Sequence, residues 1–197
     1  IPGDISSAAF WIILAACHEN AELFIPNIGL NPTRTGILEV LTKMGAKIDI
    51  SNQKTELGEP RGDLTVQSSN LTGITIEGSI IPKIIDEIPI LSLAACFASG
   101  ETVIKDAQEL RVKESDRIKA TVQGLFKLGA DISETEDGMI IKNSPNLKGS
   151  EVNSHGDHRI AMMLGISGLL TEGQTIITNA EAANISYPNF WDQIDNF

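Results

Sequence analysis

Three stretches of the chain are apolar at almost every position, and each begins beside an aspartate. They read GDISSAAFWIILAAC from Gly3, IDEIPILSLAACFASG from Ile85 and GDHRIAMMLGISGLLTEG from Gly156. A helix without a polar face has to be buried on most of its sides. The pattern therefore predicts three helices in the interior of the protein.

A similar series of elements follows each apolar stretch. A strand-like run comes first (AELFIPNIG, ETVIKDA and QTIITNA), and a second helix comes next (TRTGILEVLTKMGA, ESDRIKATVQGLFKLGA and the shorter PNFWDQIDNF). After the first two of these helices, further β segments follow, and they alternate as in DGMIIKN, which is typical of a sheet with one wet face. The order helix, strand, helix, strand, strand thus recurs roughly every 70 to 80 residues, with a truncated last copy.

These copies predict one domain of the mixed α/β (α+β) class over residues 1–197, made of three repeats at about 1–67, 68–147 and 148–197. We expect the helices to lie inside and the sheets outside, which is the reverse of a doubly wound fold. The chain begins at Ile1 with IPGD and lacks an initiator methionine. We therefore expect it to be a fragment of a longer protein.

Composition changes this picture little but excludes some partners. With 42% hydrophobic and 21% charged residues, the sequence is that of an ordinary globular protein. A net charge of −11 argues against nucleic acid and anionic membrane surfaces, and the apolar runs are too short to span a bilayer. Cys17 and Cys96 lie in apolar runs, which predicts two buried thiols in a reducing compartment, and no Cys/His spacing resembles a zinc site. Because no signal-peptide pattern opens the chain, we expect a cytoplasmic protein.

The aspartates at the helix starts have two interpretations. Asp4, Asp86 and Asp157 could each cap a helix by accepting hydrogen bonds from the free N–H groups of its first turn. In DHRIAM, however, His158 and Arg159 accompany the aspartate, and a cap requires neither of them. Positive charge at a helix start is unfavourable against the macrodipole, so this pair favours an anionic ligand.

The segment ELRVKESDRIKA, residues 109–120, carries six charged side chains in its first nine positions. On one helix, Lys113 and Arg117 would be i, i+4 neighbours with Glu114 between them, as in a solvated ladder of salt bridges. Alternatively, Arg111, Lys113 and Arg117 form a basic group that holds substrate anions while Glu114 moves a proton. The charge pattern alone leaves both open. Neither of the other two repeats has this cluster, which favours the second interpretation.

Two further observations narrow the chemistry. No Gly-rich phosphate loop of the GxxxxGK[ST] or GxGxxG type occurs, so a nucleotide phosphate is not held in that way. The run NPTRT at 31–35 predicts a turn and a helix start, and it leaves Arg34 able to face a site.

Six ordered motifs carry a resemblance to a known family. LRVKESDRI at 110–118 resembles a signature of the 5-enolpyruvylshikimate-3-phosphate synthases, also called 3-phosphoshikimate 1-carboxyvinyltransferases. The other five, in chain order, are PGDISSAAF, NPTRTGILEVLTKMGA, IDEIPIL, GDHRIAM and SYPNFW. The resemblance extends over the whole sequence but over only about half of the family's chain. It implies one of two similar lobes, each built from three βαβαββ units with helices packed inside. This sequence is similar to the C-terminal lobe from the hinge onward, without the N-terminal lobe.

The resemblance also implies an activity. Family members transfer the enolpyruvyl group of phosphoenolpyruvate to the 5-hydroxyl of shikimate 3-phosphate and release phosphate, a step toward chorismate and the aromatic amino acids. They do so by addition and elimination through a tetrahedral intermediate, without a metal or an organic cofactor, and we expect the full enzyme to be monomeric. The alternatives are the sister enzyme that transfers enolpyruvyl to UDP-N-acetylglucosamine, and a substrate-binding lobe without catalysis. We expect the isolated lobe to be inactive.

Site residues carry over by motif. Asp86 matches the carboxylate that accepts the hydroxyl proton and contacts shikimate 3-phosphate. Lys113 matches a lysine that contacts the same substrate and the reacting centre, and Glu114 matches a candidate for protonating the methylene carbon of phosphoenolpyruvate. The residues that match the phosphoenolpyruvate-binding side of the site are Arg117, Arg159 and, beside them, His158.

One position departs from the family pattern. Some members carry a lysine two residues before the aromatic–Pro pair, where it contacts phosphoenolpyruvate, and this chain has Ile185 there. This departure puts the tightness of phosphoenolpyruvate binding in question.

Overall fold

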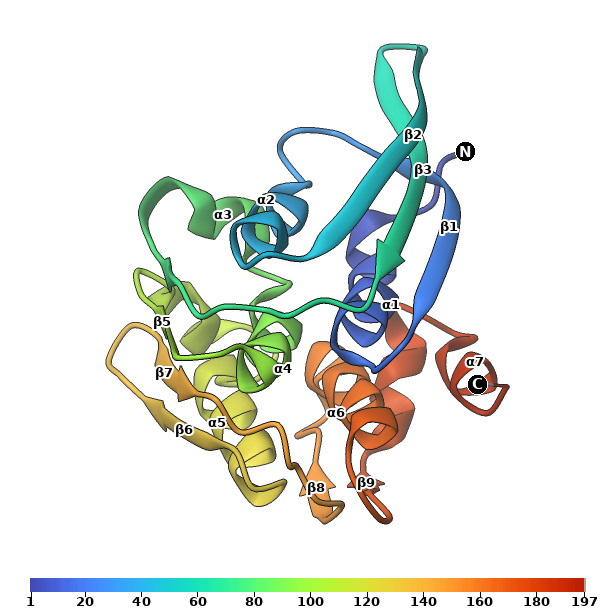
Figure 1. The fold of residues 1–197 in the computed structure, drawn as a ribbon. Helices are drawn as coiled ribbons and strands as arrows, with labels where there is room; N and C mark the ends of the chain where they lie inside the picture. Colours follow the sequence, from blue (N-terminus) through green and yellow to red (C-terminus); the bar gives the residue numbers. More distant parts are fainter. Residues whose placement is uncertain (197) are drawn as a thin grey trace.

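Three apolar helices form the centre of the protein, whose computed structural model describes residues 1–196 (Figure 1). They are α1 (Ile5–Cys17), α4 (Ile88–Phe97) and α6 (His158–Leu170), and each contacts the other two. In α1 every residue from 8 to 16 is buried, so that this part of the helix has no face toward solvent. The burial confirms the prediction drawn from the apolar stretches.

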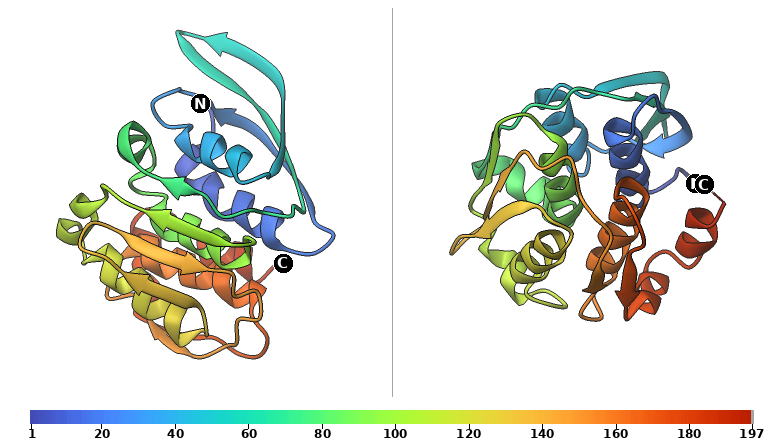
Figure 2. Two further views of the ribbon diagram at one scale, coloured as in Figure 1. Left: turned by 60° about the vertical axis from the view of Figure 1, so that its left-hand side comes forward. Right: turned by 60° about the horizontal axis from the view of Figure 1, so that its bottom comes forward.

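Three sheets lie outside these helices, as Figure 2 shows from two further sides. The first is antiparallel in the order β1-β3-β2, the second has the order β4-β5-β7-β6 with a short parallel strand at its edge, and the third is the parallel pair β8-β9. The strands are β1 (Glu22–Gly29), β2 (Lys47–Glu56), β3 (Glu59–Gln67), β4 (Thr75–Ile76), β5 (Glu101–Ile104), β6 (Asp131–Glu134), β7 (Met139–Lys142), β8 (Glu151–Asn153) and β9 (Ile176–Thr178). The predicted class, with helices inside and sheets outside, is confirmed.

Each sheet includes a parallel pairing between the residues before a central helix and the strand that follows this helix. Gly3 pairs with Ile28 of β1, β4 pairs with β5, and β8 pairs with β9. In each case a central helix connects the two partners, which makes it the crossover of a β-α-β unit. A second helix and a β-hairpin follow in the first two copies, whereas after β9 the residues up to 196 form only the 3-10 helix η3 (Ala180–Ile185) and α7 (Phe190–Ile194). The predicted order of elements is present, and the division into three repeats with fixed boundaries stays a prediction.

Two amphipathic helices flank the central ones. In α2 (Gly36–Lys43), Ile37 and Leu41 are fully buried, and in α5 (Arg117–Lys127) the same is true of Ile118. The spacing of one helical turn places such residues on the face toward the core. The remaining helical turns are η1 (Gly78–Ile80), α3 (Ile81–Ile84) and η2 (Gln108–Val112).

Both cysteines are free and lie against the core. Burial raises the pKa of Cys96 to about 12, and its thiol donates a hydrogen bond to the Ser92 carbonyl at 3.3 Å. Burial, together with the neighbouring Cys96, also raises the pKa of Cys17. Both thiols are therefore protonated at neutral pH.

Candidate active site

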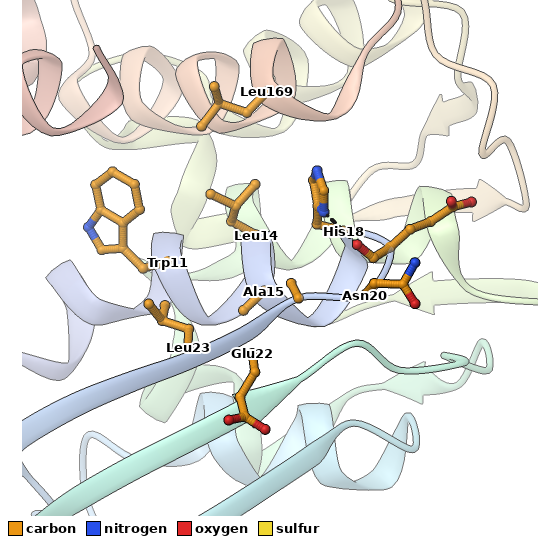
Figure 3. Close-up of a pocket in the computed structure, with 10 residues that line it drawn as sticks. Trp11, Leu14, Ala15, His18, Asn20, Glu22, Leu23 and Leu169 are labelled. Carbon is orange, nitrogen blue, oxygen red and sulfur yellow. Dashed lines mark hydrogen bonds between the residues drawn. The ribbon is translucent and has the colours of Figure 1, made fainter. Parts of the chain in front are cut away.

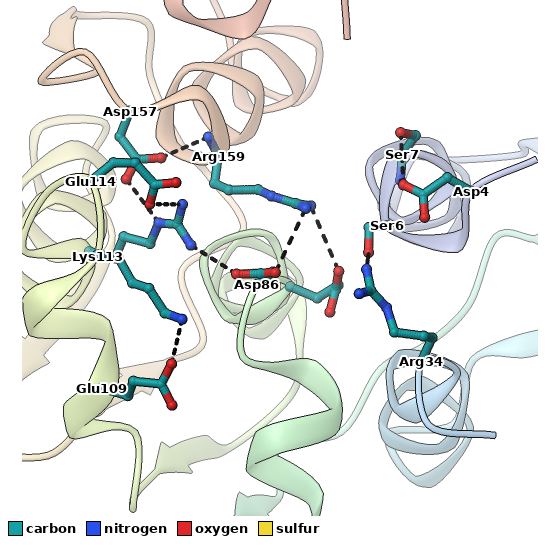
Figure 4. A network of polar contacts seen from close by, with 12 residues as sticks. Asp4, Ser6, Ser7, Arg34, Asp86, Glu109, Lys113, Glu114, Asp157 and Arg159 are labelled. Carbon is teal, nitrogen blue, oxygen red and sulfur yellow. Dashed lines mark hydrogen bonds and ion pairs between the residues drawn. The ribbon is translucent and has the colours of Figure 1, made fainter. Parts of the chain in front are cut away.

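The starts of the central helices carry polar side chains at one end of the helix core (Figure 4). Asp4 caps α1 by accepting a hydrogen bond from the Ser7 amide at 3.0 Å. Asp157 caps α6 by accepting one from the Arg159 amide at 2.8 Å. The capping interpretation is therefore confirmed for these two aspartates.

Asp86 differs from the two caps. It lies in the turn between α3 and α4, and the cap position of α4 belongs to Glu87, whose side chain makes no capping hydrogen bond. The Asp86 carboxylate instead accepts a hydrogen bond from Arg117 at 3.0 Å, and about a third of its side chain, 34%, remains exposed. The capping interpretation is wrong for Asp86, because its carboxylate faces the neighbouring helix starts and not its own helix.

Arg117, the first residue of α5, is the buried cation of the site, with 2% of its side chain exposed. Its Nε donates to Asp157 at 2.8 Å, its Nη1 to Asp86 at 3.0 Å and its Nη2 to Glu114 at 2.6 Å. A buried charge is tolerated where it is paired and hydrogen-bonded, and here all three nitrogens meet that condition. Arg117 therefore ties the starts of α4, α5 and α6 to one another.

Asp157 is fully buried and faces Arg117 as its permanent counter-ion. The Ser115 hydroxyl donates to the same carboxylate oxygen at 3.0 Å. Burial alone would raise the pKa of Asp157, but the hydrogen bond and charge of Arg117, with the Arg159 amide, outweigh burial and lower it. Asp157 thus stays ionised at neutral pH and holds the site together.

Arg159, in the first turn of α6, is held much more loosely than Arg117. Its Nη2 lies 4.0 Å from an Asp86 oxygen and its Nη1 lies 3.7 Å from Glu87 Oε1, which are separations longer than hydrogen bonds. Within residues 1–196, neither the buried Arg159 Nε nor the buried Glu87 Oε1 has a hydrogen-bond partner. Arg159 therefore presents unused donors at the same helix ends where each of the three Arg117 nitrogens already donates to a carboxylate.

Two titratable groups beside Arg159 are shifted by burial. Burial raises the pKa of Glu87, and a hydrogen bond with Ser6 and the charge of Arg159 offset this only in part. Burial also lowers the pKa of His158, and the charge of Arg159 lowers it further. His158 is therefore neutral at pH 7, and the positive charge of the site comes from its arginines and from Lys113.

The structure corrects the prediction of one helix through the charged segment. The 3-10 helix η2 ends at Val112, the backbone is extended at Lys113, and α5 begins only at Arg117. The Asp116 side chain accepts a hydrogen bond from the Lys119 amide at 3.0 Å, and this cap sets the start of α5. Lys113 and Arg117 are consequently not neighbours on a helix.

The predicted basic group is divided as well. Lys113 forms an ion pair with Glu109, and Figure 4 shows its ammonium turned toward that carboxylate. Arg111 bonds to the β6–β7 hairpin, so it does not form one basic group with Lys113 and Arg117. The structure brings Asp86, Glu114, Arg117 and Arg159 together, with His158 beside them in sequence and Lys113 at the edge.

Arg34 approaches the site from the start of α2. Its Nη2 donates to the Ser6 hydroxyl at 2.7 Å, so the side chain faces this region. Within the described residues, no carboxylate forms an ion pair with Arg34. Sequence reasoning missed Ser6, Glu87 and Ser115. Glu87 directly follows Asp86, but nothing in the sequence signals that a glutamate at a helix start is buried.

A separate cavity of about 540 Å³ lies at the other end of α1 (Figure 3). Its lining includes the apolar side chains of Trp11, Leu14 and Leu169. The residues that line it include no Lys or Arg that could bind an anion. This cavity therefore does not compete with the helix starts as a site for anionic substrates.

Two other kinds of site were sought in residues 1–196. No group of three or more His, Cys, Asp or Glu side chains there is arranged to hold a metal ion. None of the helices in this part of the chain combines the length and apolarity that a membrane span requires.

Comparison with known proteins connects this geometry to one family. A family model described as EPSP synthase (3-phosphoshikimate 1-carboxyvinyltransferase) matches residues 1–194. The chain is 57% identical over 192 residues to the 3-phosphoshikimate 1-carboxyvinyltransferase of Roseiflexus castenholzii, covering 98% of this chain and 44% of that protein. It is 54% identical over 195 residues to that of Thermoanaerobacter pseudethanolicus, covering 99% and 46%. The chain thus spans a little under half the length of these curated relatives.

Solved structures show the same likeness in three dimensions. An EPSP synthase from Acinetobacter baumannii superposes with a TM-score of 0.94 at 43% identity, covering all of this chain and 46% of that one. The enolpyruvyl transferase NikO from Streptomyces tendae reaches a TM-score of 0.81 at 18% identity, covering all of this chain and 43% of that one. The second likeness is one of fold alone.

Proposed function

The chain belongs to the EPSP synthase (3-phosphoshikimate 1-carboxyvinyltransferase) family, and we propose that it supplies one half of an active site for that reaction. The proposed reaction transfers the enolpyruvyl group of phosphoenolpyruvate to the 5-hydroxyl of shikimate 3-phosphate and releases phosphate. It is a step of the shikimate pathway toward chorismate and the aromatic amino acids.

The proposal includes a second lobe. Residues 1–197 are proposed to form the C-terminal lobe, because the chain spans about 44% of its relatives and the polar residues lie at the open ends of the helices. A lobe closing over these ends would exclude water and strengthen every charge interaction there. We therefore expect the isolated chain to bind the substrates weakly and to turn over neither.

One observation carries the proposal, namely that Asp86 lies between an arginine that is paired with carboxylates at all three nitrogens and one that has no carboxylate within hydrogen-bonding distance. Arg117 already has three carboxylate partners, whereas Arg159 has none within hydrogen-bonding distance. Guanidinium groups suit carboxylate and phosphate, the two anionic groups of phosphoenolpyruvate. Arg159 is proposed to take this substrate first, and Arg117 to join when Glu114 moves off its Nη2.

The proposed departure of Glu114 from Arg117 links the binding of phosphoenolpyruvate to the proton transfer that follows. Glu114 is half exposed and Arg117 is its partner across a single turn, so it can leave while the buried partner Asp157 stays. Once released, the Glu114 carboxyl group is free to reach the methylene carbon of phosphoenolpyruvate. The same residue is thus proposed to keep the empty site neutral and to act in the filled one.

The proposed sequence of bond changes assigns one proton to each carboxyl group. Asp86 accepts the proton of the 5-hydroxyl while that oxygen bonds to C2 of phosphoenolpyruvate, and Glu114 gives a proton to the methylene carbon, which forms the tetrahedral intermediate. One proton of the new methyl group then returns to the Glu114 carboxylate, and the C–H electron pair forms the new C=C bond to C2. The bond from C2 to the phosphate oxygen breaks, and phosphate leaves with the electron pair of that bond. Lys113 contacts shikimate 3-phosphate and stabilises negative charge at the reacting centre.

Phosphate release by the complete two-lobed protein tests the proposal. We expect release with phosphoenolpyruvate and shikimate 3-phosphate, and none above background when UDP-N-acetylglucosamine replaces the shikimate ester. Turnover of the sugar nucleotide alone would contradict the assignment in favour of the sister reaction. Binding of both shikimate-pathway substrates without release would favour a substrate-binding protein.

A second measurement tests the division of the site. The purified 197-residue chain, assayed alone, is expected to release no phosphate, and activity is expected to appear when a separately produced N-terminal lobe is added. Release by the chain alone at a rate near that of the two-lobed protein would contradict the shared site.

Ile185, which is 73% exposed, offers no cation to phosphoenolpyruvate. Ile185→Lys is therefore expected to lower the KM for phosphoenolpyruvate in the two-lobed protein.

A further inference from the structure

Arg111 fastens the segment that precedes α5 to the β6–β7 hairpin. Its Nη2 donates to the Thr135 carbonyl at 2.5 Å and its Nε to the Glu136 carbonyl at 2.8 Å. Its Nη1 donates to Asp116 at 2.9 Å and, at a longer 3.4 Å, to Glu134. Two of these acceptors are main-chain carbonyls of a hairpin turn, which cannot swing away as a carboxylate side chain can. A substrate anion would therefore not displace this guanidinium.

The same turn holds the other end of η2. The Ala107 amide donates to the Asp137 carbonyl at 2.7 Å, and the Asp106 amide donates to the Asp137 side chain at 2.8 Å. The close approach requires glycine next to it, because a Cβ on Gly138 would lie 1.9 Å from the Ile104 carbonyl oxygen. The 3-10 helix is thus bonded at its beginning and at its end to one hairpin turn.

Asp116 connects this anchor to the first turn of α5. One of its carboxylate oxygens accepts from the Lys119 amide at 3.0 Å, and the other accepts from Arg111. Residues 113–115 therefore run between Arg111 on one side and Asp116 on the other, and these two side chains are bonded to each other. A short segment between two joined points has few conformations available to it.

We propose that Arg111 is a positioning residue, which holds Lys113 and Glu114 in the places from which they act on substrate. This inference rests on the proposed function, because both residues receive their roles there. In this role Arg111 does not bind substrate, because its donors are bonded to the hairpin and to Asp116. Displacing a catalytic group by about 1 Å is enough to cost roughly a hundredfold in rate.

The central test compares Arg111→Gln with a matched control in the complete two-lobed protein. Lys105→Gln removes a cation of the same region, where Lys105 makes an exposed ion pair with Glu77 and its charge acts only weakly on Asp137. We expect Arg111→Gln to lower kcat and the affinity for shikimate 3-phosphate, each about tenfold or more, with unchanged circular dichroism. The control is expected to match the wild type. An Arg111→Gln protein with wild-type kcat and affinity would overturn the proposal.

A cycle with Lys113 separates positioning from general stability. If Arg111 acts through Lys113, Arg111→Gln weakens binding of shikimate 3-phosphate in the wild type but adds little in a Lys113→Met background. Equal fold-losses in both backgrounds would show that Arg111 acts on the fold as a whole, and the proposal would be wrong.

Hydrogen exchange keeps this inference distinct from the proposed function, because it needs no substrate. Amides of residues 113–116 are expected to exchange faster in Arg111→Gln than in the wild type and the Lys105→Gln control. Unchanged exchange there would overturn the positioning role by itself. If exchange rises but the wild-type protein neither binds nor turns over shikimate 3-phosphate, the anchor stands and the proposed function fails.

Discussion

The starts of α5 and α6 present two arginines to the same carboxylate, Asp86, and hold them in opposite ways. Arg117 is buried and makes three hydrogen bonds of 2.6 to 3.0 Å to carboxylates. The nearest carboxylate oxygens to Arg159 lie at 3.7 and 4.0 Å, and its Nε has no hydrogen-bond partner among residues 1–196. Two residues of the same charge at neighbouring helix starts can therefore have different roles. The closely paired Arg117 stabilises the fold before any ligand binds, whereas the loosely held Arg159 is available to a ligand at once.

The largest expected effect is on stability. Arg117→Met leaves the buried Asp157 carboxylate without its counter-ion, and we expect the free energy of unfolding to fall by about 3–5 kcal/mol. Arg159→Met is expected to cost under about 1 kcal/mol, because Glu87 has a raised pKa and can take up a proton when its neighbour is lost. Urea unfolding of both variants measures the contrast. Equal losses would show that the two arginines do not differ as described.

The next effect is on turnover. In the two-lobed protein, Asp86→Asn is expected to lower kcat by about a hundredfold to ten-thousandfold, as for a lost general base, with little change in stability. Stability is spared because Asp86 caps no helix and asparagine can still accept the Arg117 hydrogen bond. Asp4→Asn serves as the control, since asparagine caps α1 as well as aspartate does. Near-normal turnover of the Asp86 variant would remove it from the chemistry.

A smaller effect is expected on substrate affinity. Arg159→Gln removes the charge-assisted hydrogen bonds that we propose for phosphoenolpyruvate, and we expect the KM for this substrate to rise by about tenfold to a hundredfold. The KM for shikimate 3-phosphate is expected to stay within about twofold, because that ester is assigned to Asp86 and Lys113. Steady-state kinetics with each substrate varied in turn gives both values. If only the KM for shikimate 3-phosphate rose, Arg159 would have to be assigned to shikimate 3-phosphate and not to phosphoenolpyruvate.

The smallest effect is the dependence of stability on pH. It has opposite signs for Asp157, which is paired with Arg117, and for Glu87, which lies beside Arg159. The pKa of Asp157 is lowered in the folded protein, so its stabilising contribution is present above the unfolded value, about 3.9, and is lost as pH falls through the folded pKa. The pKa of Glu87 is raised, so its contribution is present at low pH and is lost as pH rises from about 4.3 through the folded pKa. The free energy of unfolding against pH is expected to lose its acid-side decline in Asp157→Asn and its decline above about pH 4 in Glu87→Gln. Curves parallel to the wild type in both variants would contradict these shifts.

The interior of the fold was predictable from the sequence because its cause is local. Helices that are apolar on all sides can lie only inside, and the free amides at a helix start need an acceptor such as Asp4 or Asp157. The side chains that meet at Arg117 were predictable in part, because they carry charge at the starts of separate helices. The motifs identify these side chains, but the distances between them depend on how the helices pack.

The parts that could not be predicted depend on contacts between distant residues. The start of α5 is set locally by the Asp116 cap, but the placement of η2 before it involves Arg111, whose acceptors at 135 and 136 lie 24 and 25 residues further along the chain. No periodicity within residues 109–120 reports on carbonyls so far away. The burial of Glu87 has the same origin, because it depends on α1 and α6 packing beside the turn before α4.

The two protonated thiols, Cys96 buried and Cys17 half-buried, make the chain a suitable background for site-specific labelling. Because burial keeps Cys17 and Cys96 protonated at neutral pH, maleimide reagents will react with them slowly. Val112 is 81% exposed and directly precedes Lys113, so Val112→Cys would place a fast-reacting thiol at the edge of the site. A fluorophore attached there would report, through a change in its emission, whether the proposed second lobe closes over the helix ends.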